Sequence, residues 1–236
     1  MSTHVFLAVP HYGQLQPDAL ASLMLASQKH RVALNTNGAS LLAFNFNCLW
    51  CAALNARTDK SLTHFAMHHA DIAAEPAWLD VLINEMQRVG ADILSVVIPI
   101  KDSRGLTSTG WQDPESLQIR RLSMHEIHGH TETFSADDLP LRRAHLMINT
   151  GLFVCDFTQP WVEEACFEIR DRIVRTGTGR FQANVLPEDW NFSAWAASRG
   201  LRVFATRKVK ARHFGTTSFD NHSPWGDWHS DLGDQR

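Results

Sequence analysis

Short apolar runs alternate with longer helical stretches along the first hundred residues, and this alternation restricts the fold more than any other feature of the sequence. A strand, a helix and a second strand in this order form a right-handed parallel unit in nearly all proteins. The chain therefore predicts an α/β fold with a mixed, mostly parallel central sheet flanked by helices. The expected strands are residues 4–10, 30–34, 62–67 and 91–99, and the expected helices are residues 17–29, 40–56 and 76–89.

The second half of the chain has a weaker pattern. The polar stretch 102–143 predicts a long functional excursion with one hairpin, since loops of this length usually cover a site. The residues Asn-Thr-Asn-Gly at 35–38 predict a turn after the second strand. The remaining expected elements are a strand at 147–157, an amphipathic helix at 161–175, a helix at 188–199 and a last strand at 201–206.

Composition excludes several classes of protein. The net charge of −3 gives no strong nucleic-acid signature and no attraction to an anionic membrane. No apolar run approaches the roughly 20 residues of a membrane span, and the N-terminus lacks the pattern of a signal peptide. The four cysteines lie in apolar stretches, which favours reduced, buried thiols and a cytoplasmic protein.

Charged side chains follow the expected strands at the ends where open α/β sheets bind ligands. Asp71 lies just beyond the strand at 62–67, Lys101 follows the strand at 91–99, and His213 follows the last strand. One carboxylate and one imidazole, with diphosphate oxygens and water, would give a near-octahedral site for Mn²⁺ or Mg²⁺. The alternatives are that Asp71 is a turn residue and that His213 is structural.

A pair of carboxylates, Glu188 and Asp189, opens the helix expected at 188–199. A carboxylate in this position can act as general base on an acceptor hydroxyl, or it can simply stabilise the positive end of the helix. Lys101 and Arg104 could reach a phosphate or remain solvated. Gly151 at a strand start would let the backbone approach a sugar, or it marks a bulge.

The order of these motifs resembles that of the family 2 inverting nucleotide-sugar glycosyltransferases, which have the GT-A fold. That family shows a first strand ending in Pro, a helix before the metal-site strand, an Asp-x-Asp motif, a Glu-Asp pair opening a helix, and a downstream His. The matching features here are Pro10, the helix at 45–55, His69-Ala70-Asp71, Glu188-Asp189 and His213. His69 stands where the first Asp of the motif is usual.

The resemblance implies one GT-A-like, Rossmann-related domain over 1–236, with a nucleotide-binding half at 1–100, an acceptor and catalytic half at 101–215 and a tail at 216–236. It implies that Asp71, His213 and, less strongly, His69 bind Mn²⁺ or Mg²⁺. It also implies that Asp189, beside Glu188, deprotonates an unidentified acceptor for inverting attack. A UDP-sugar is the default nucleotide-sugar donor, and its expected contacts are Pro10, Tyr12, Asn35, Asn37, Asn47, Lys101 and Gly151.

Two other functions remain open. A nucleotidyltransferase acting on sugar phosphates should carry a basic phosphate loop after the first strand, and residues 10–15 contain no Lys or Arg. A non-catalytic nucleotide-binding or sugar-binding module is the second alternative.

Three further motifs have alternative interpretations. The histidines at 125, 128 and 130 lack the spacing of a zinc protease. Cys48 and Cys51 favour core packing over a zinc site. Trp111, Trp225 and Trp228 form either an aromatic platform for an acceptor or hydrophobic cover.

Overall fold

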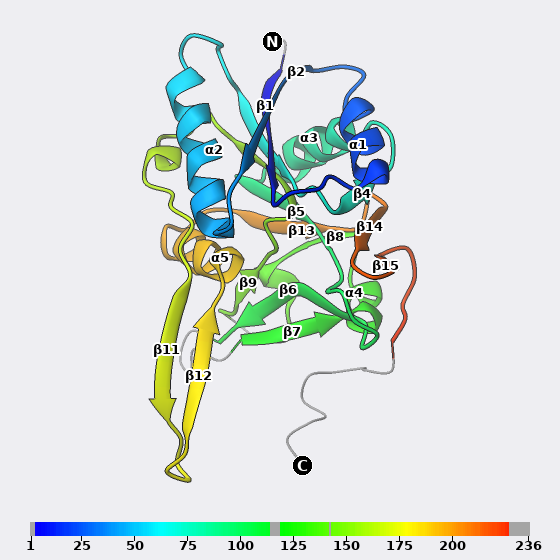
Figure 1. Cartoon of the computed structure of the whole chain (residues 1–236). Coiled ribbons are helices and arrows are strands. Elements are labelled where there is room, and N and C mark those ends of the chain that lie inside the picture. The colour runs from blue at the N-terminus through cyan, green and yellow to red at the C-terminus, as the bar shows by residue number, and fades with distance from the viewer. Residues whose placement is uncertain (1–2, 114–118, 142, 227–236) are drawn as a thin grey trace.

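The centre of the protein is a mixed seven-stranded sheet (Figure 1), in a computed structural model that describes residues 3–113, 119–141 and 143–226. Its strand order is β2-β1-β3-β10-β5-β13-β8. The strands that share one direction are β1 (His4–His11), β2 (Arg31–Gly38), β3 (His64–His68), β5 (Ile93–Val96) and β13 (Val203–Thr206), and the two that oppose them are β8 (Thr133–Ser135) and β10 (Leu152–Asp156). The predicted α/β class and mostly parallel sheet are confirmed.

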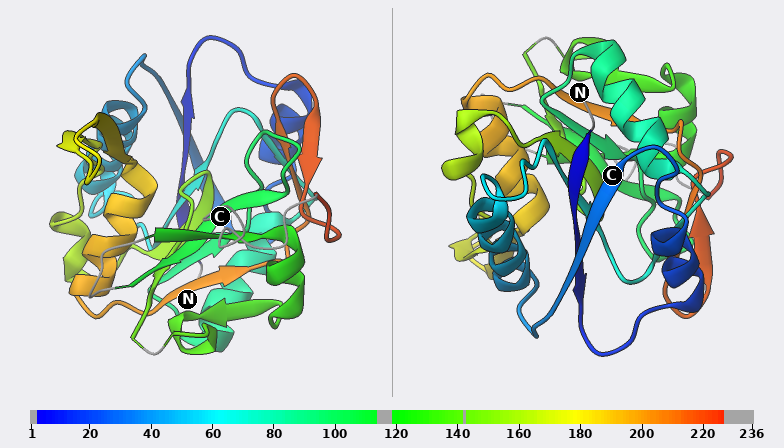
Figure 2. Two further views of the ribbon diagram at one scale, coloured as in Figure 1. Left: turned by 90° about the horizontal axis from the view of Figure 1, so that it is seen from below. Right: turned by 90° about the horizontal axis from the view of Figure 1, so that it is seen from above.

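Helices cover both faces of this sheet, as Figures 1 and 2 show. Successive side chains of a strand point to opposite faces, and β1 is apolar on both. Phe6 packs in the same cluster as Trp50, whereas Leu7 packs in the cluster of Trp78. The first cluster lies under α2 (Leu42–Ala56) and α5 (Glu188–Ser198), and the second lies under α1 (Pro17–Met24) and α3 (Trp78–Val89).

Two three-stranded antiparallel sheets accompany the central one in the described part of the chain. The excursion at 102–143 contains the predicted hairpin, β6 (Leu106–Gln112) and β7 (Ile119–Ser123), and β6 also pairs with β9 (His145–Met147). It continues through α4 (Met124–Gly129), β8 and the 3-10 turn η1 (Ala136–Asp138). The other sheet joins β4 (Ile72–Ala74), β14 (Ala211–Phe214) and β15 (Ser218–Asp220).

Three sequence predictions are wrong. Residues 35–38 do not turn but continue β2, because the parallel pairing of Ala8 with Asn35 and of His11 with Gly38 outweighs local turn preference. The strand expected at 147–157 is two strands in different sheets, β9 beside β6 and β10 in the central sheet, because residues 148–151 between them form no strand. The helix expected at 161–175 is a 3-10 turn, η2 (Pro160–Glu163), followed by β11 (Arg170–Arg175). β11 pairs with β12 (Phe181–Leu186) instead of packing on the core.

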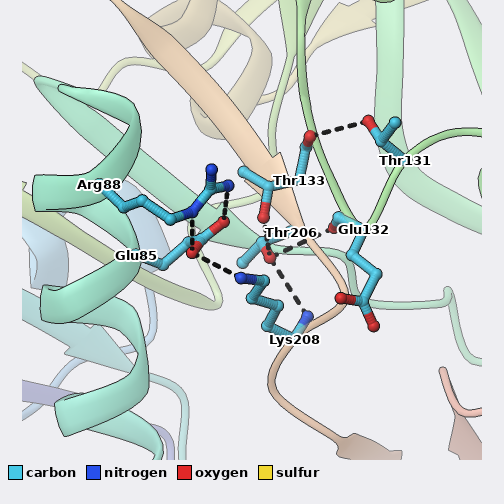
Figure 3. Close-up of polar contacts among 7 residues, drawn as sticks. All are labelled: Glu85, Arg88, Thr131, Glu132, Thr133, Thr206 and Lys208. Atoms are coloured by element: carbon cyan, nitrogen blue, oxygen red, sulfur yellow. Dashed lines mark hydrogen bonds and ion pairs between the residues drawn. The ribbon is translucent and has the colours of Figure 1, made fainter.

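A polar cluster joins α3 to the end of β13 (Figure 3). The Glu85 side chain is 4% exposed and accepts hydrogen bonds from Arg88 and from Lys208, the latter at 2.8 Å. Hydrogen bonding by Arg88, which outweighs burial, and by Lys208 lowers the pKa of Glu85 to about 2. The cluster fixes the segment that leads from β13 to β14. Within the described residues, no helix is long and apolar enough to cross a membrane.

Candidate active site

A cavity of about 470 Å³ lies where the carboxyl ends of β1 and β3 meet the first turn of α5. Most of the residues predicted to carry the chemistry line it, although they come from six separate parts of the chain. They are Pro10, Tyr12, His69, Asp71, Lys101, Gly151, Glu188, Asp189 and His213.

Asp71 and His213 are brought together by a short antiparallel ladder. β4 follows Asp71 directly, and its Ile72 pairs with His213 on β14. The backbone N–H of Phe214 donates to the carbonyl oxygen of Asp71 at 2.8 Å. As a result, Asp71 Oδ1 lies 3.6 Å from His213 Nε2, although the two residues are far apart in sequence.

The Asp71 carboxylate faces positive charge on its other oxygen. Lys101 Nζ forms an ion pair with Asp71 Oδ2. Burial raises the pKa of Asp71, but the neighbouring His213 ring and Lys101 ammonium outweigh burial and hold this pKa far below its usual range. Asp71 is therefore ionised at any pH at which the protein would be assayed, and it is a ready ligand for a cation.

His213 presents a ring nitrogen toward this carboxylate, and the His69 ring lies in the lining of the same cavity. His213 Nδ1 lies 2.8 Å from the Pro99 carbonyl oxygen, which can only accept, so Nδ1 carries the hydrogen and a neutral ring has its lone pair on Nε2. His69 packs against Phe46, with ring centres 5.1 Å apart, and its Nε2 is buried without a hydrogen-bond partner among the described residues. Burial, opposed by the Asp71 charge, lowers the pKa of His69 to about 4.

These atoms fit a metal ion only as a two-ligand set. Asp71 Oδ1 is buried and makes no hydrogen bond within the described part of the chain, and the His213 Nε2 lone pair faces it. A metal-binding histidine usually donates its other nitrogen to a carbonyl or carboxylate, as His213 does to Pro99. Residues 3–113, 119–141 and 143–226 contain no group of three His, Cys, Asp or Glu side chains arranged for a metal, so His69 does not complete a three-ligand site.

The carboxylates of Glu188 and Asp189 lie in the cavity lining at the start of α5. Burial, together with the neighbouring Glu188 charge, raises the pKa of Asp189 to about 7. The backbone N–H of Trp190 donates to Asp189 Oδ1 at 2.8 Å and orients the group. Burial also raises the pKa of Glu188. Asp189 can therefore exchange a proton near neutral pH.

Gly151 forms part of the cavity wall for a steric reason. A Cβ at this position would lie 2.8 Å from Ile72 Cδ1 and 3.4 Å from both Asn149 Oδ1 and His69 Nδ1. Asn149 was missed as a site residue, although it lines the cavity and its Oδ1 accepts from the Gly151 N–H at 3.0 Å. The signal was present, because Asn before Thr-Gly is typical of a side chain that caps its own turn.

Three predicted donor contacts do not line the cavity. The two ends of the Asn47 amide bind the backbone N–H and carbonyl of Phe167, at 2.9 and 2.8 Å. Asn37 donates to the Asn45 side chain at 2.9 Å, and Asn35 donates to the Ala33 carbonyl at 3.1 Å. These amides stabilise the protein itself. Besides Pro10 and Tyr12, the first 42 residues contribute a different set of side chains to the cavity wall: His11, Gln14, Ala39, Ser40 and Leu42.

The other sequence motifs lie outside the cavity. His125 bonds to the Gly226 carbonyl at 3.1 Å, and His130 stacks on Phe134. The prediction that the cysteines are buried is wrong for Cys51 and Cys166, which are exposed.

The predicted tryptophan platform is dispersed. The Arg120 guanidinium lies over the Trp111 ring at 5.8 Å, and Trp225 stacks on Phe219, with ring centres 5.7 Å apart. Trp228 lies outside the described residues.

Comparisons with known proteins support the fold and leave the activity open. No family model and no curated protein matches this chain. The solved structure of A197 from STIV is similar over 96% of both chains, with a TM-score of 0.57 and 14% sequence identity. A candidate UDP-N-acetylglucosamine pyrophosphorylase from Entamoeba histolytica matches 86% of this chain and 73% of its own, with a TM-score of 0.41 and 11% identity, which is too low to support an argument.

Proposed function

We propose that this protein transfers a sugar from a nucleotide-sugar donor to an acceptor hydroxyl with inversion, and that Asp189 is the general base. The observation that carries the proposal is the composition of one cavity. Asp71, His213 and Lys101, which suit a diphosphate and its counter-ion, share it with a carboxylate whose pKa is about 7. Inverting glycosyl transfer requires both of these parts and no enzyme nucleophile.

Asp189 has the properties that proton abstraction needs. A general base works best when its pKa is close to the working pH. In the proposed step, Asp189 takes the acceptor hydroxyl proton as the acceptor oxygen bonds to the anomeric carbon. The bond from that carbon to the phosphate oxygen breaks, and the nucleoside diphosphate leaves with the electron pair. The Trp190 N–H holds the carboxylate in place for this transfer.

The opposite part of the cavity is proposed to hold the donor diphosphate. Lys101 ends in an ammonium group that can leave Asp71 for a phosphate oxygen. Asp71 and His213 would then hold Mn²⁺ or Mg²⁺, which would offset the charge of the leaving diphosphate. With one protein carboxylate at this position, we expect the metal to bind weakly until the diphosphate supplies further oxygens.

Pro10 and Tyr12 are proposed to contact the nucleotide base. The Tyr12 ring is 81% exposed beside the cavity and is free to stack on a base. The cavity lining gives no further preference among bases, so UDP-sugars are the first donors to test.

The decisive experiment combines donor binding with product identification. UDP is titrated by calorimetry with and without Mn²⁺, and a panel of UDP-sugars and acceptors is assayed for release of nucleoside diphosphate. Asp189→Asn should retain UDP binding and lose at least about 100-fold in turnover, because it removes the base. Asp71→Ala should lose the Mn²⁺-dependent part of UDP binding. The exposed Asp59→Asn change is the matched control and should alter neither quantity.

Other outcomes would assign a different function. Release of pyrophosphate from a nucleoside triphosphate and a sugar phosphate would favour nucleotidyl transfer. Mn²⁺-dependent UDP binding without turnover on any acceptor, and without change in Asp189→Asn, would favour a binding module.

A further inference from the structure

A two-stranded ribbon formed by β11 and β12 extends away from the body of the protein beside α5 (Figure 1). The two strands pair with each other and with no other strand of the described chain. Large apolar side chains of the ribbon are exposed. Ile173 is 80% exposed, Phe181 is 75% exposed and Val185 is 59% exposed.

These apolar side chains share one face of the ribbon. Directly paired residues of antiparallel strands point to the same side, and the pairs here are Asp171 with Val185, Ile173 with Ala183, and Arg175 with Phe181. On this face, all three β12 residues and the central β11 residue, Ile173, are apolar. The other two β11 residues are charged, with Asp171 at one end and Arg175 at the other. We call these six residues the ribbon face.

The opposite side of the ribbon has a different composition. It carries Arg170, Arg172 and Val174 from β11, opposite Leu186, Asn184 and Gln182 of β12. Cations are therefore concentrated on that side, whereas the ribbon face carries one charge of each sign. The ribbon face is not suited to a purely anionic partner, because the Asp171 carboxylate beside its apolar residues would repel one.

The ribbon face is complementary to a copy of itself. Two such faces can pack on each other with their strands antiparallel, related by a two-fold axis that passes beside Ile173. Ile173 then contacts Ile173 of the second copy, and Phe181 contacts Val185 of the second copy. Asp171 of each ribbon then meets Arg175 of the other. Asp171 has no ion-pair partner within the described residues, so this contact would supply one. A two-fold interface requires this kind of self-complementary patch.

We propose that the ribbon face is a homodimer interface whose occupant is the ribbon of a second copy of this chain. The four-stranded, two-layer contact covers the exposed apolar side chains and pairs the two charges of each face. The inference depends on the ribbon alone and is independent of the proposed activity.

Sedimentation velocity over a range of protein concentrations tests the proposal through charge exchange. The wild type should dimerise. Asp171→Arg and Arg175→Asp should each raise the dimer dissociation constant at least about tenfold, because each places like charges opposite one another. An equimolar mixture of the two variants should recover the dimer as a heterodimer, because the arginine introduced at position 171 of one chain then faces the aspartate introduced at position 175 of the other. The double variant should recover a homodimer for the same reason.

Two matched variants test the apolar part of the contact. Ile173→Lys should abolish dimerisation, and Arg172→Asp, on the opposite side of the same strand, should leave it unchanged. Circular dichroism of both variants should match the wild type, because both side chains are exposed.

Several results would overturn the proposal. They are a monomer at every concentration, a dimer that survives Ile173→Lys, or a failure of the two charge variants to associate with each other. If the monomeric protein instead bound vesicles of anionic lipid and lost that binding with Ile173→Lys, the ribbon face would be a membrane contact.

Discussion

The raised pKa of Asp189 predicts a measurable loss of stability as the pH rises. In the folded protein the Asp189 carboxyl keeps its proton up to about pH 7, whereas in the unfolded chain it ionises near its ordinary value of 3.8. Between pH 5 and pH 7 the folded state therefore binds the extra proton, and the free energy of unfolding falls with pH. Each pH unit in this window is worth about 1.4 kcal/mol, so the two units amount to about 2.7 kcal/mol.

Asp189→Asn removes the titrating group and should remove this slope. The free energies of unfolding of wild type and variant are measured in urea at pH 5 and at pH 8. The stability of the variant relative to wild type should increase by about 2.7 kcal/mol between these conditions. Other titrating groups are common to both proteins and cancel in the comparison.

The same measurement on Asp59→Asn provides the control, since this carboxylate is exposed. Parallel pH dependences for wild type and Asp189→Asn would show that Asp189 ionises as an ordinary carboxyl. The reasoning that makes it a base poised near neutral pH would then be refuted. The test does not depend on knowing the donor or the acceptor.

Three further substitutions have defined outcomes in urea unfolding or UDP calorimetry. Asn221→Ala should cost about 2–3 kcal/mol of unfolding free energy by leaving buried backbone groups unpaired, and it should weaken Mn²⁺-dependent UDP binding because it loosens β14. Glu85→Ala should lower the free energy of unfolding by about 1–2 kcal/mol. This contribution is present above pH 4.5 and is lost as the pH falls toward 2, because the pKa of Glu85 is lowered in the folded state. Glu132→Ala, at an exposed position, is the control and should leave the stability unchanged. Gly151→Ala should weaken UDP binding at least about tenfold with little change in fold, because its Cβ would press on Ile72.

The sequence was sufficient to predict elements whose pattern is produced by the core. β1 is buried on both faces, and its continuous apolar run identified it. Sequence reasoning failed where tertiary partners override local preference. Asn35 and Gly38 have strong turn tendencies, yet both lie in the parallel ladder with β1.

The ribbon strand β11 has no such pattern, because it does not pack on the core. In Arg170–Arg175 the apolar and charged residues do not alternate strictly, and no core contact marks the strand. Together with the preceding Trp161 and Val162, the segment predicts one amphipathic helix, although β11 itself contributes nothing to the core. A strand whose partner is solvent, or another chain, leaves no burial pattern in its own sequence.

The candidate site was predicted better by its polar residues than by the elements that carry them. Asp71 and His213 meet because the three-residue strand β4 pairs with β14, and such short ladders have no periodicity to detect. β14 in turn depends on Asn221, which is 2% exposed. Its Nδ2 donates to the carbonyls of Val97 and Val209 at 3.0 and 3.2 Å, and its Oδ1 accepts from the Ala211 N–H at 2.9 Å.

One amide thus connects the end of β5, the approach to β14 and β14 itself. The first of these connections leads on to Pro99, whose carbonyl fixes the His213 ring, and to Lys101, which faces Asp71. The relative placement of Asp71, Lys101 and His213 therefore depends on a residue outside the cavity. In sequence Asn221 is an ordinary loop asparagine, because the three side-chain hydrogen bonds given above form only after the sheets have assembled.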